Sequence, residues 1–274
     1  MRKAAVVVAA VLALLAAYSL IEPYLILVNR VDFADDRLPE SFDGKRIVFV
    51  SDIHCGPLFS IGRTRELVDS IDGLEPDMIL LGGDYISSDD IFNTGDRIGP
   101  CLGEFSRLKA PLGAYAVLGN HENWAGRDRA MNSLESASIR VIDNDGVWAS
   151  SGNGSIRIAG VADLWTQRQD FNAALDGAKA SDYTILLSHN PDIAEYLRSD
   201  SIALVLSGHT HGGQVTLFGL WTPYLPSNAG QKYAGGFVKT NHTTVFVTKG
   251  VGTTGLPMRF FARPEIVVLT LHRE

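Results

Sequence analysis

An apolar run that ends in two potential metal ligands decides the fold, because residues 46–54 read RIVFVSDIH. After Arg46 the run is entirely β-branched or aromatic, which indicates a buried strand. Asp52 and His54 follow at the point where that strand would end. Loops at the carboxyl ends of strands converge on one edge of a sheet in α/β proteins, and ligands bind at that edge. The stretch therefore predicts a strand whose end contributes to a functional site.

The same arrangement recurs four times further along the chain. Nearly continuous apolar runs occupy residues 78–81, 114–118, 183–187 and 202–206, as is typical of strands covered on both faces. The clusters that follow them are Gly82-Gly83-Asp84-Tyr85, Gly119-Asn120-His121-Glu122, Ser188-His189-Asn190 and Gly208-His209-Thr210-His211. Because all five clusters follow strands, we expect their side chains to meet at one sheet edge.

Segments of helical character separate the apolar runs. We expect helices near residues 62–71, 97–108, 127–136, 171–178 and 193–197, and further strands at 156–161, 244–248 and 266–271. This alternation predicts one α/β (α+β) domain over residues 45–274. Residues 30–44, which are rich in Asp, read as a short linker before it.

The residue types in the clusters indicate a metal site that hydrolyses phosphate esters. Carboxylate and imidazole groups suit Zn²⁺, Mn²⁺ and Fe, and a carboxylate bridges two ions about 3.5 to 4 Å apart. Such a pair lowers the pKa of a bound water and contacts both the attacking and the leaving oxygen. Each cluster alone has an ordinary structural explanation, such as a turn carboxylate or a satisfied histidine. Five of them together, each after an apolar run, favour the metal site.

At these residues the sequence resembles the calcineurin-like metallophosphoesterases. Their motifs read Asp-x-His, Gly-Asp, Gly-Asn-His followed by Asp or Glu, a single His, and Gly-His-x-His, and all five occur here in order. The resemblance covers roughly residues 47–271. It implies a sandwich of two β-sheets flanked by helices, with a dinuclear metal site at one edge.

The resemblance also implies a role for each motif residue. Seven residues would hold two divalent ions (Mn, Fe or Zn): Asp52, His54 and His211 the first, Asn120, His189 and His209 the second, and Asp84 both. A hydroxide activated by the two ions would attack phosphorus in line. His121 would contact the phosphate and protonate the leaving group. Glu122 would assist it, although many members carry Asp at that position.

The N-terminus is long and apolar enough to cross a membrane. Residues 4–21 carry no charge, and 18 helical residues reach about 27 Å, close to the hydrocarbon thickness of a bilayer. We favour a retained signal anchor over residues 1–29, because apolar character resumes at 24–28. The alternative is a signal that is cleaved near Ser19, which would give a secreted enzyme. Arg2 and Lys3 place the anchor's start in the cytoplasm, so a single-pass membrane protein would hold its catalytic domain outside.

A finer resemblance connects the chain with the YkuE/YaeI-like branch of membrane-associated bacterial phosphoesterases. It is carried by residues 208–214, 233–236 and 255–260 and by the apolar N-terminus. This branch implies a phosphodiesterase acting at the membrane. One related member hydrolyses a UDP-linked diacylglucosamine, so a pyrophosphatase of a lipid-linked nucleotide sugar is an alternative. The predicted outward orientation weakens that alternative, because nucleotide sugars are cytoplasmic.

Several residues outside the motifs are candidates for substrate contact. Residues 217–225 are apolar and aromatic, and beside the metals they would receive an acyl chain or touch the bilayer. The alternative, which we favour, is a hairpin that covers the core. Trp124, Trp221 and Arg259 are candidate substrate-binding residues, against a default role in packing or surface ion pairs.

Composition argues against several other classes of protein. The formal net charge is -7 and there is no basic patch, so we expect no nucleic-acid surface. Two cysteines, Cys55 and Cys101, cannot form a disulfide framework or a Cys-rich zinc site, and we expect Cys55 to be a small side chain in a crowded turn. No feature predicts a protein partner. A catalytically silent metal-binding protein at the membrane is the competing hypothesis, and the intact His121 argues against it.

Overall fold

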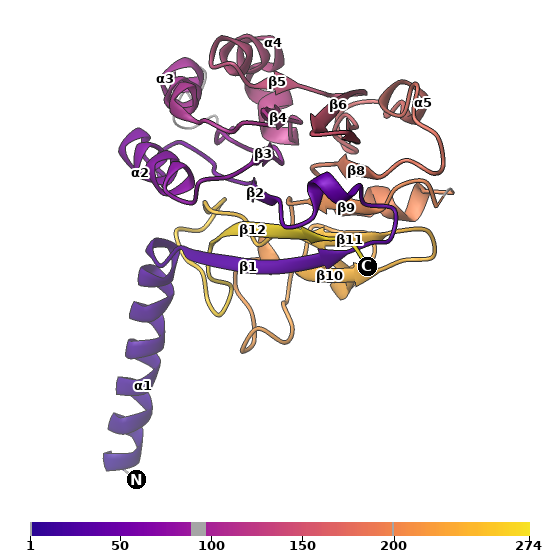
Figure 1. Ribbon diagram of the computed structural model, residues 1–274. Helices are drawn as coiled ribbons and strands as arrows, with labels where there is room; N and C mark the ends of the chain where they lie inside the picture. Colours follow the sequence, from indigo (N-terminus) through magenta and orange to yellow (C-terminus); the bar gives the residue numbers. More distant parts are fainter. Residues whose placement is uncertain (1, 89–96, 199) are drawn as a thin grey trace.

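The two sheets of the domain form a sandwich (Figure 1), in a computed structural model that describes residues 2–88, 97–198 and 200–274. The first sheet has the order β1-β12-β2-β3-β4-β5 and the second β10-β11-β9-β8-β7-β6. The strands of the first are β1 Leu27–Ala34, β2 Arg46–Val50, β3 Met78–Leu81, β4 Ala114–Ala116, β5 Arg140–Val141 and β12 Glu265–His272. Those of the second are β6 Asp145–Ser151, β7 Gly154–Gly160, β8 Thr184–Leu187, β9 Leu204–Ser207, β10 Gly236–Lys239 and β11 Thr244–Val247.

Alternation along β2 explains why its apolar run is continuous. Ile47 and Phe49 point between the two sheets, where they pack with residues of β8 and β9. Val48 and Val50 point to the opposite face and pack under helices. Successive side chains of a strand face opposite sides, so a strand covered on both faces is apolar throughout. The expected sandwich flanked by helices is confirmed.

Helices cover the outer face of each sheet (Figure 1). The α-helices of the domain are α2 Ile61–Asp72, α3 Ile98–Gly103, α4 Asn120–Ser136 and α5 Phe171–Ala174. The 3-10 turns are η1 Glu22–Tyr24, η2 Glu40–Phe42, η5 Glu104–Arg107, η6 Pro191–Tyr196, η7 His211–Gly213 and η8 Gly230–Tyr233. Several expectations differ. The helix expected at 193–197 is the 3-10 turn η6, which begins at a proline, and α5 ends four residues before the expected 178. α4 begins seven residues before the expected 127, and the second half of the helix expected at 97–108 is the 3-10 turn η5.

Residues 30–44 are not a linker. β1 pairs in parallel with β12 from Leu27 to Ala34, and Leu38 and Phe42 are fully buried between the sheets. β1 lies at an edge of its sheet and is exposed at every other residue. Its charged residues lie along that exposed edge, so the segment looked polar in sequence.

The N-terminal helix α1, Arg2–Ile21, projects away from the domain (Figure 1). Its 20 residues extend about 30 Å, which confirms the expected apolar helix of membrane-spanning length. The base of α1 is attached to the domain. Ser19 accepts a hydrogen bond from the backbone N–H of Arg259 at 2.9 Å, and the Glu22 carboxylate accepts those of Phe261 and Ala262 at 2.8 and 2.6 Å.

Cys55 and Cys101 form a disulfide bond, which corrects the expectation for Cys55. The bond joins the loop after β2 to α3, and both sulfurs lie in the core beneath the metal motifs. A single pair separated by 46 residues has no spacing pattern that sequence reading detects.

Candidate metal centre

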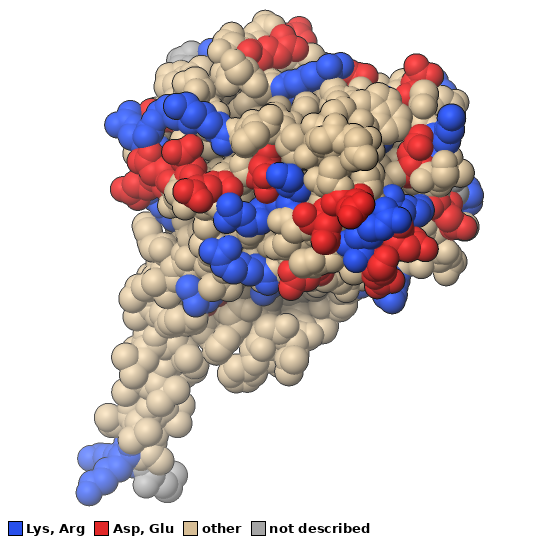
Figure 2. All heavy atoms as spheres, viewed as in Figure 1, with Lys and Arg blue, Asp and Glu red and all other residues tan. Residues whose placement is uncertain are grey.

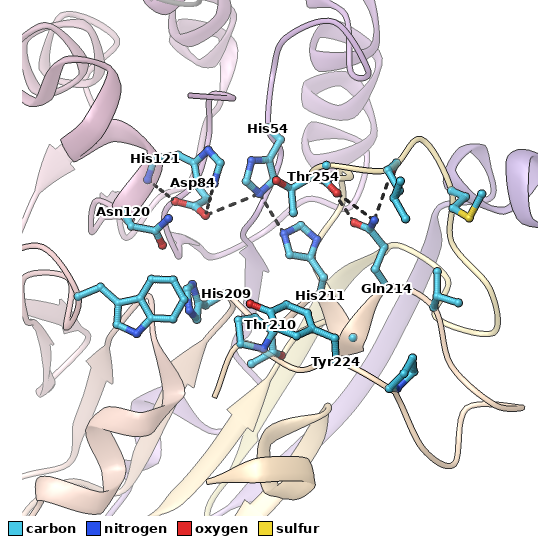
Figure 3. A pocket seen from close by; sticks show the side chains of 18 of the residues that line it. His54, Asp84, Asn120, His121, His209, Thr210, His211, Gln214, Tyr224 and Thr254 are labelled. Atoms are coloured by element: carbon cyan, nitrogen blue, oxygen red, sulfur yellow. Dashed lines mark hydrogen bonds and ion pairs between the residues drawn. The ribbon is translucent and has the colours of Figure 1, made fainter. Parts of the chain in front are cut away.

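The five motif loops bring their side chains together at one edge of the sandwich, and not at the edge of a single sheet as expected, because β2, β3 and β4 belong to one sheet and β8 and β9 to the other. His54, Asp84, Asn120, His209 and His211 point into one pocket from the ends of four strands (Figure 3). The ligand candidates Asp52 and His189 lie beneath them and are fully buried. The chain positions that supply these groups span about 160 residues, so the edge of the sandwich and not local sequence assembles the site.

Asp52, His54 and His211 form the first group of potential ligands. The Nε2 atoms of His54 and His211 are 3.0 Å apart, and the Nε2 of His211 is 3.5 Å from Asp52 Oδ1. Two imidazole nitrogens directed at one point beside a carboxylate oxygen match the donor set of a divalent transition metal.

Asp84, His189 and His209 form the second group. The Nε2 of His189 lies 3.1 Å from His209 Nδ1 and 3.2 Å from Asp84 Oδ2. That same Oδ2 is 3.6 Å from His54 Nε2 in the first group, whereas Oδ1 accepts the backbone N–H of His121. One oxygen of Asp84 is therefore pinned by the backbone, and the other is presented to both groups.

The amide of Asn120 supplies an independent test of the metal site. Its Oδ1 atom is buried and finds no hydrogen-bond partner among the residues that the structure describes. Buried polar atoms are almost always paired, because an unpaired one costs about 1–3 kcal/mol. A cation next to Asn120 and His209 would satisfy this oxygen, so the residues present fit a metal ion here.

Strained backbone presents many of these ligands. Asp52, His54, Asp84, His209 and His211 all have positive φ, between 49° and 68°. Residues other than glycine rarely adopt this left-handed region, and such strain concentrates at functional sites. The loops maintain these conformations through backbone hydrogen bonds, such as His54 N–H to Asp84 C=O at 3.0 Å.

Two glycines allow the carboxylates to approach the neighbouring loops. A Cβ atom on Gly119 would overlap the Asp84 carboxylate, and one on Gly208 would overlap that of Asp52. Any side chain at these positions would displace a ligand, so glycine is required there by close packing.

Burial and mutual charge perturb the titration of the site in the absence of metal. Burial raises the pKa of Asp52 to about 6, and the charge of Asp84 acts in the same direction. Burial also lowers the pKa of His209 to about 3, and it lowers the pKa of His54 well below the usual value. The pKa of His189 shifts the other way. Burial acts to lower it, but the neighbouring Asp84 carboxylate holds the pKa of His189 well above its usual value. Metal binding to His189 and Asp84 would therefore release a proton.

His121 is held in one tautomer by the loop after β3. The backbone N–H of Ser88 donates to its Nδ1 at 3.0 Å. An N–H group cannot accept, so Nδ1 is unprotonated and the neutral ring carries its hydrogen on Nε2. Nε2 lies 3.9 Å from Asp84 Oδ2, on the side of the ring that faces the pocket. The arrangement suits a group that donates a hydrogen bond from Nε2 into the cavity, and sequence reasoning missed the contribution of Ser88.

Glu122 does not contact the His121 side chain in the way that the resemblance implied. Its carboxylate is fully buried and accepts four backbone N–H groups, those of Asp84, Tyr85, Ile86 and Gly119, at 2.7–3.1 Å. Burial, together with the charge of Asp84, raises its pKa to about 7. Glu122 therefore connects two motif loops to each other, and its assistance to His121 stays a prediction.

The three candidate substrate residues lie in different places. Trp124 lines the pocket beside His121, with ring centroids 5.3 Å apart. Trp221 lies outside this pocket and is half exposed. Arg259 is fully buried behind His211, where its Nη2 lies 3.2 Å from the Nδ1 of that ring. Arg259 therefore supports a ligand from behind and does not face substrate.

The pocket over the ligands has a volume of about 540 Å³ and continues over apolar residues. Beyond the histidines it is lined by Trp165, Tyr224, Leu256 and Met258. The ring of Trp165 packs edge-on against His209 at 4.2 Å. Trp165 follows the end of β7, and this position was the one signal in the sequence that could have revealed it.

Comparison with known families agrees with this geometry. The model of the family described as calcineurin-like phosphoesterase matches residues 45–213, more than half of the chain. The chain belongs to this family. This calcineurin-like phosphoesterase is therefore a phosphoric ester hydrolase with a metal-binding site.

Relatives share most of the length of this phosphoesterase. YkuE of Bacillus subtilis, an uncharacterized metallophosphoesterase, is 33% identical over 92% of this chain and 87% of its own. A transmembrane protein with metallophosphoesterase domain from Danio rerio is 30% identical over 97% of this chain and 62% of its own. The phosphodiesterase YaeI of Escherichia coli is 29% identical over 82% of each chain.

The fold is shared with a solved structure. The 5'-nucleotidase precursor of Thermus thermophilus superposes with a TM-score of 0.51 at 16% identity, over 82% of this phosphoesterase. The phosphoesterase spans about half (54%) of that longer chain, so the likeness concerns the fold alone.

Proposed function

We propose that this phosphoesterase is a phosphodiesterase that uses two divalent ions and acts at the outer surface of a membrane, to which α1 anchors it. The observation that carries the dinuclear part is the Oδ2 atom of Asp84, which lies within 3.6 Å of imidazole nitrogens in both ligand groups. A carboxylate oxygen within reach of both ligand groups could be shared by two adjacent ions.

The residues of the site divide the chemistry between them. When bound, the two ions supply Lewis acidity that activates water and neutralises the charge of the phosphate. The seven candidate ligand residues would hold the ions, and two of them, Asp52 and His189, are fully buried. His121 holds a hydrogen on Nε2 at the pocket wall, where it can donate a hydrogen bond to the phosphate or to the departing oxygen.

A diester substrate agrees with the charge of the pocket wall. Among the described residues that line the pocket there is no Lys or Arg. A phosphate monoester carries up to two negative charges and is commonly bound by guanidinium or ammonium groups. A diester carries one charge and needs less compensation beyond the metal ions. The name of the relative YaeI, a phosphodiesterase, supports the same preference.

An apolar group on the substrate agrees with the shape of the pocket. Tyr224, which is labelled in Figure 3, and Leu256 and Met258 continue the pocket wall beyond the candidate metal ligands. Pockets that bind amphiphilic molecules combine a few polar groups with such apolar walls. We therefore propose a phosphate ester with a lipid-like apolar part as the substrate class.

Two observations support an anchored, extracytoplasmic enzyme. The first is the Cys55–Cys101 disulfide, because disulfide bonds persist in oxidising compartments and are rare in cytosolic proteins. Ser19 and Glu22 are buried in contacts with residues 259–262, so cleavage beside Ser19 would disrupt the attachment of the helix base. These contacts favour retention of α1 over its removal as a signal.

The catalytic proposal is tested by turnover and metal content together. Full-length protein in detergent with Mn²⁺ is expected to hydrolyse bis-p-nitrophenyl phosphate faster than p-nitrophenyl phosphate and to contain two ions per chain. Asp84→Asn and His189→Ala should each reduce turnover by more than about 100-fold, since loss of a mere supporting residue already costs 10–100-fold. His242→Ala is the matched control, because this histidine lies outside the site and pairs with Asp200. Full turnover of either site variant, or one ion per chain in the native protein, would contradict the proposal.

The orientation is tested separately with fusions at the C-terminus. Alkaline phosphatase, which is active only outside the cytoplasm, is expected to be active in the fusion, and green fluorescent protein is expected to be dark. The reverse pattern would place the site in the cytoplasm and leave the pyrophosphatase alternative as the better one.

A further inference from the structure

Two apolar loops project beside the base of α1 (Figure 1), and we call them the loop platform: residues 215–226 and 255–261. Their large side chains face outward, with 88% of Leu220, 70% of Tyr224 and 64% of Phe218 exposed. This exposure contradicts the favoured expectation that residues 217–225 cover the core. Exposed apolar surface of this kind marks an interaction site.

The exposed surface of the loop platform lacks charge, because its one charged residue, Arg259, is fully buried. Residues 212–231 and 250–258 contain no Asp, Glu, Lys or Arg. In Figure 2 the surface that projects on the side of α1 is tan, whereas blue and red residues are scattered over the rest of the domain in that view. An uncharged surface with exposed Trp and Tyr is characteristic of protein regions at a bilayer interface.

The loop platform is fixed to α1 by aromatic contacts. Tyr18 packs against Phe260 and Phe261 with ring centroids 6.1 and 6.0 Å apart, and Phe261 packs against Phe218 at 5.2 Å. The hydrogen bonds of Ser19 and Glu22 attach the same loop to the end of the helix. The platform therefore cannot move along the helix axis independently of α1.

These contacts set the depth of the loop platform. Tyr18 and Ser19 lie in the last turn of α1, within about 5 Å of its end at a rise of 1.5 Å per residue. If α1 spans a bilayer, this last turn lies at the outer boundary of the hydrocarbon. The aromatic loops packed on it must then lie at that boundary too.

Two arginines mark the polar side of the same boundary. Arg63 donates to the carbonyl of Pro23 at 2.7 Å, and Arg263 donates to that of Leu25 at 3.0 Å. Both carbonyls follow directly after the helix end, so the two guanidinium groups lie just beyond the expected hydrocarbon. Arginines at this level are suited to lipid phosphates.

We propose that the loop platform inserts into the outer interface of the bilayer and that the metal pocket opens onto it, so that a substrate reaches the metals directly from the lipid layer. Tyr224 and Leu256 belong both to the platform and to the pocket wall, which makes the two surfaces continuous. This inference rests on the proposed membrane span of α1, and its first test does not depend on the reaction.

The test of insertion uses quenching of tryptophan fluorescence by brominated lipids. The full-length protein is placed, one chain per disc, in nanodiscs whose acyl chains carry bromine near the headgroup. Trp221 on the platform is 52% exposed, and Trp148 on β6, on the far side of the domain, is 41% exposed and serves as the matched control. The quenched fraction should fall in Trp221→Phe and rise in Trp148→Phe, because only Trp221 contacts lipid.

The possible outcomes distinguish a loop platform that is covered by the bilayer from one that is covered by another protein segment. Equal quenching in the two variants would overturn the proposal. Protection of Trp221 from aqueous acrylamide without quenching by bromine would also overturn it, because a protein segment would then cover the platform. A single chain per disc excludes a second copy as the source of protection.

A second test asks whether insertion delivers the substrate. Leu220→Asp places a charge on the most exposed platform residue, which does not line the metal pocket. In nanodiscs, turnover of a phosphodiester with two acyl chains should fall by on the order of tenfold or more, the loss expected when burial of one leucine is removed. Turnover of bis-p-nitrophenyl phosphate by the same variant should be unchanged. Equal turnover of the lipid substrate by native and variant proteins would overturn delivery from the bilayer, whereas absence of turnover on every ester would instead contradict the proposed function.

Discussion

The two oxygens of Asp84 have separate partners, and this division shows how single atoms define the site. Oδ1 is bound by the backbone of His121, and Oδ2 remains directed at both ligand groups. The same logic applies to Glu122, whose two oxygens are both occupied by N–H donors. A carboxylate is needed there because both of its oxygens accept hydrogen bonds and neither carries a donor.

Glu122→Gln tests this positioning role. The amide would turn an N–H donor towards backbone N–H groups and leave buried donors unpaired, at a cost of about 1–3 kcal/mol of unfolding free energy. We expect lower thermal stability and weaker retention of metal, measured by calorimetry and by metal analysis after dialysis. Glu66→Gln on the exposed surface of α2 is the control. If Glu122→Gln had native stability and metal content but a shifted pH profile, Glu122 would be an acid-base group instead.

Asp143 gives a prediction of pH dependence outside the metal ligands. Burial raises its pKa to about 6, although the Leu118 N–H and Arg127 oppose this. Between about pH 4 and 6 the folded protein therefore holds a proton on Asp143 that the unfolded chain has released. The contribution of Asp143 to the free energy of unfolding falls as pH rises through this interval and is constant above it. A shift of about two units corresponds to roughly 3 kcal/mol.

The measurement compares native protein and Asp143→Asn by urea unfolding between pH 4 and 7. The free energy of unfolding of the native protein should decline relative to that of the variant as pH rises across this interval. The changed contact with Arg127 adds a constant difference between the two proteins and does not affect this trend. Parallel stability curves for the two proteins would contradict the raised pKa.

At the scale of elements, Phe42 tests whether residues 30–44 belong to the domain. Its side chain is 1% exposed between the sheets, and Phe→Ala substitutions in cores cost about 3–5 kcal/mol. Phe42→Ala should therefore strongly lower the urea midpoint. Phe237→Ala on β10, where the side chain is 42% exposed, should cost much less. Similar small losses in both variants would restore the linker interpretation.

The elements that sequence reading found and missed differ in their environment. β2, β3, β8 and β9 are covered on both faces, so their apolar runs are continuous and visible in the sequence. β1 and β10 lie at sheet edges with alternating exposure, and they were not predicted. The ligand motifs were found because they follow buried strands. The contact of Ser88 with His121 depends on the tertiary fold, and no local pattern records it.

At the scale of the whole molecule, the Cys55–Cys101 bond stabilises the half of the site that carries Asp84. A cross-link between residues 46 positions apart lowers the conformational entropy of the unfolded chain. This raises the free energy of unfolding by about 4 kcal/mol at 25 °C. Reductant should therefore lower the unfolding midpoint of the native protein. The Cys55→Ser, Cys101→Ser double variant should start at the lower midpoint and not respond to reductant. A reductant-insensitive native midpoint, with both thiols shown to be free, would contradict this contribution.

The close approach at Gly119 and Gly208 has a consequence for genetics. A methyl group at either position would displace a carboxylate of the centre, although neither glycine contributes a ligand atom. Glycine and alanine codons differ by one nucleotide, so inactivating alleles should arise at these two positions by single base changes. A selection for loss of function would then recover alanine at Gly119 and Gly208 alongside replacements of the histidines themselves.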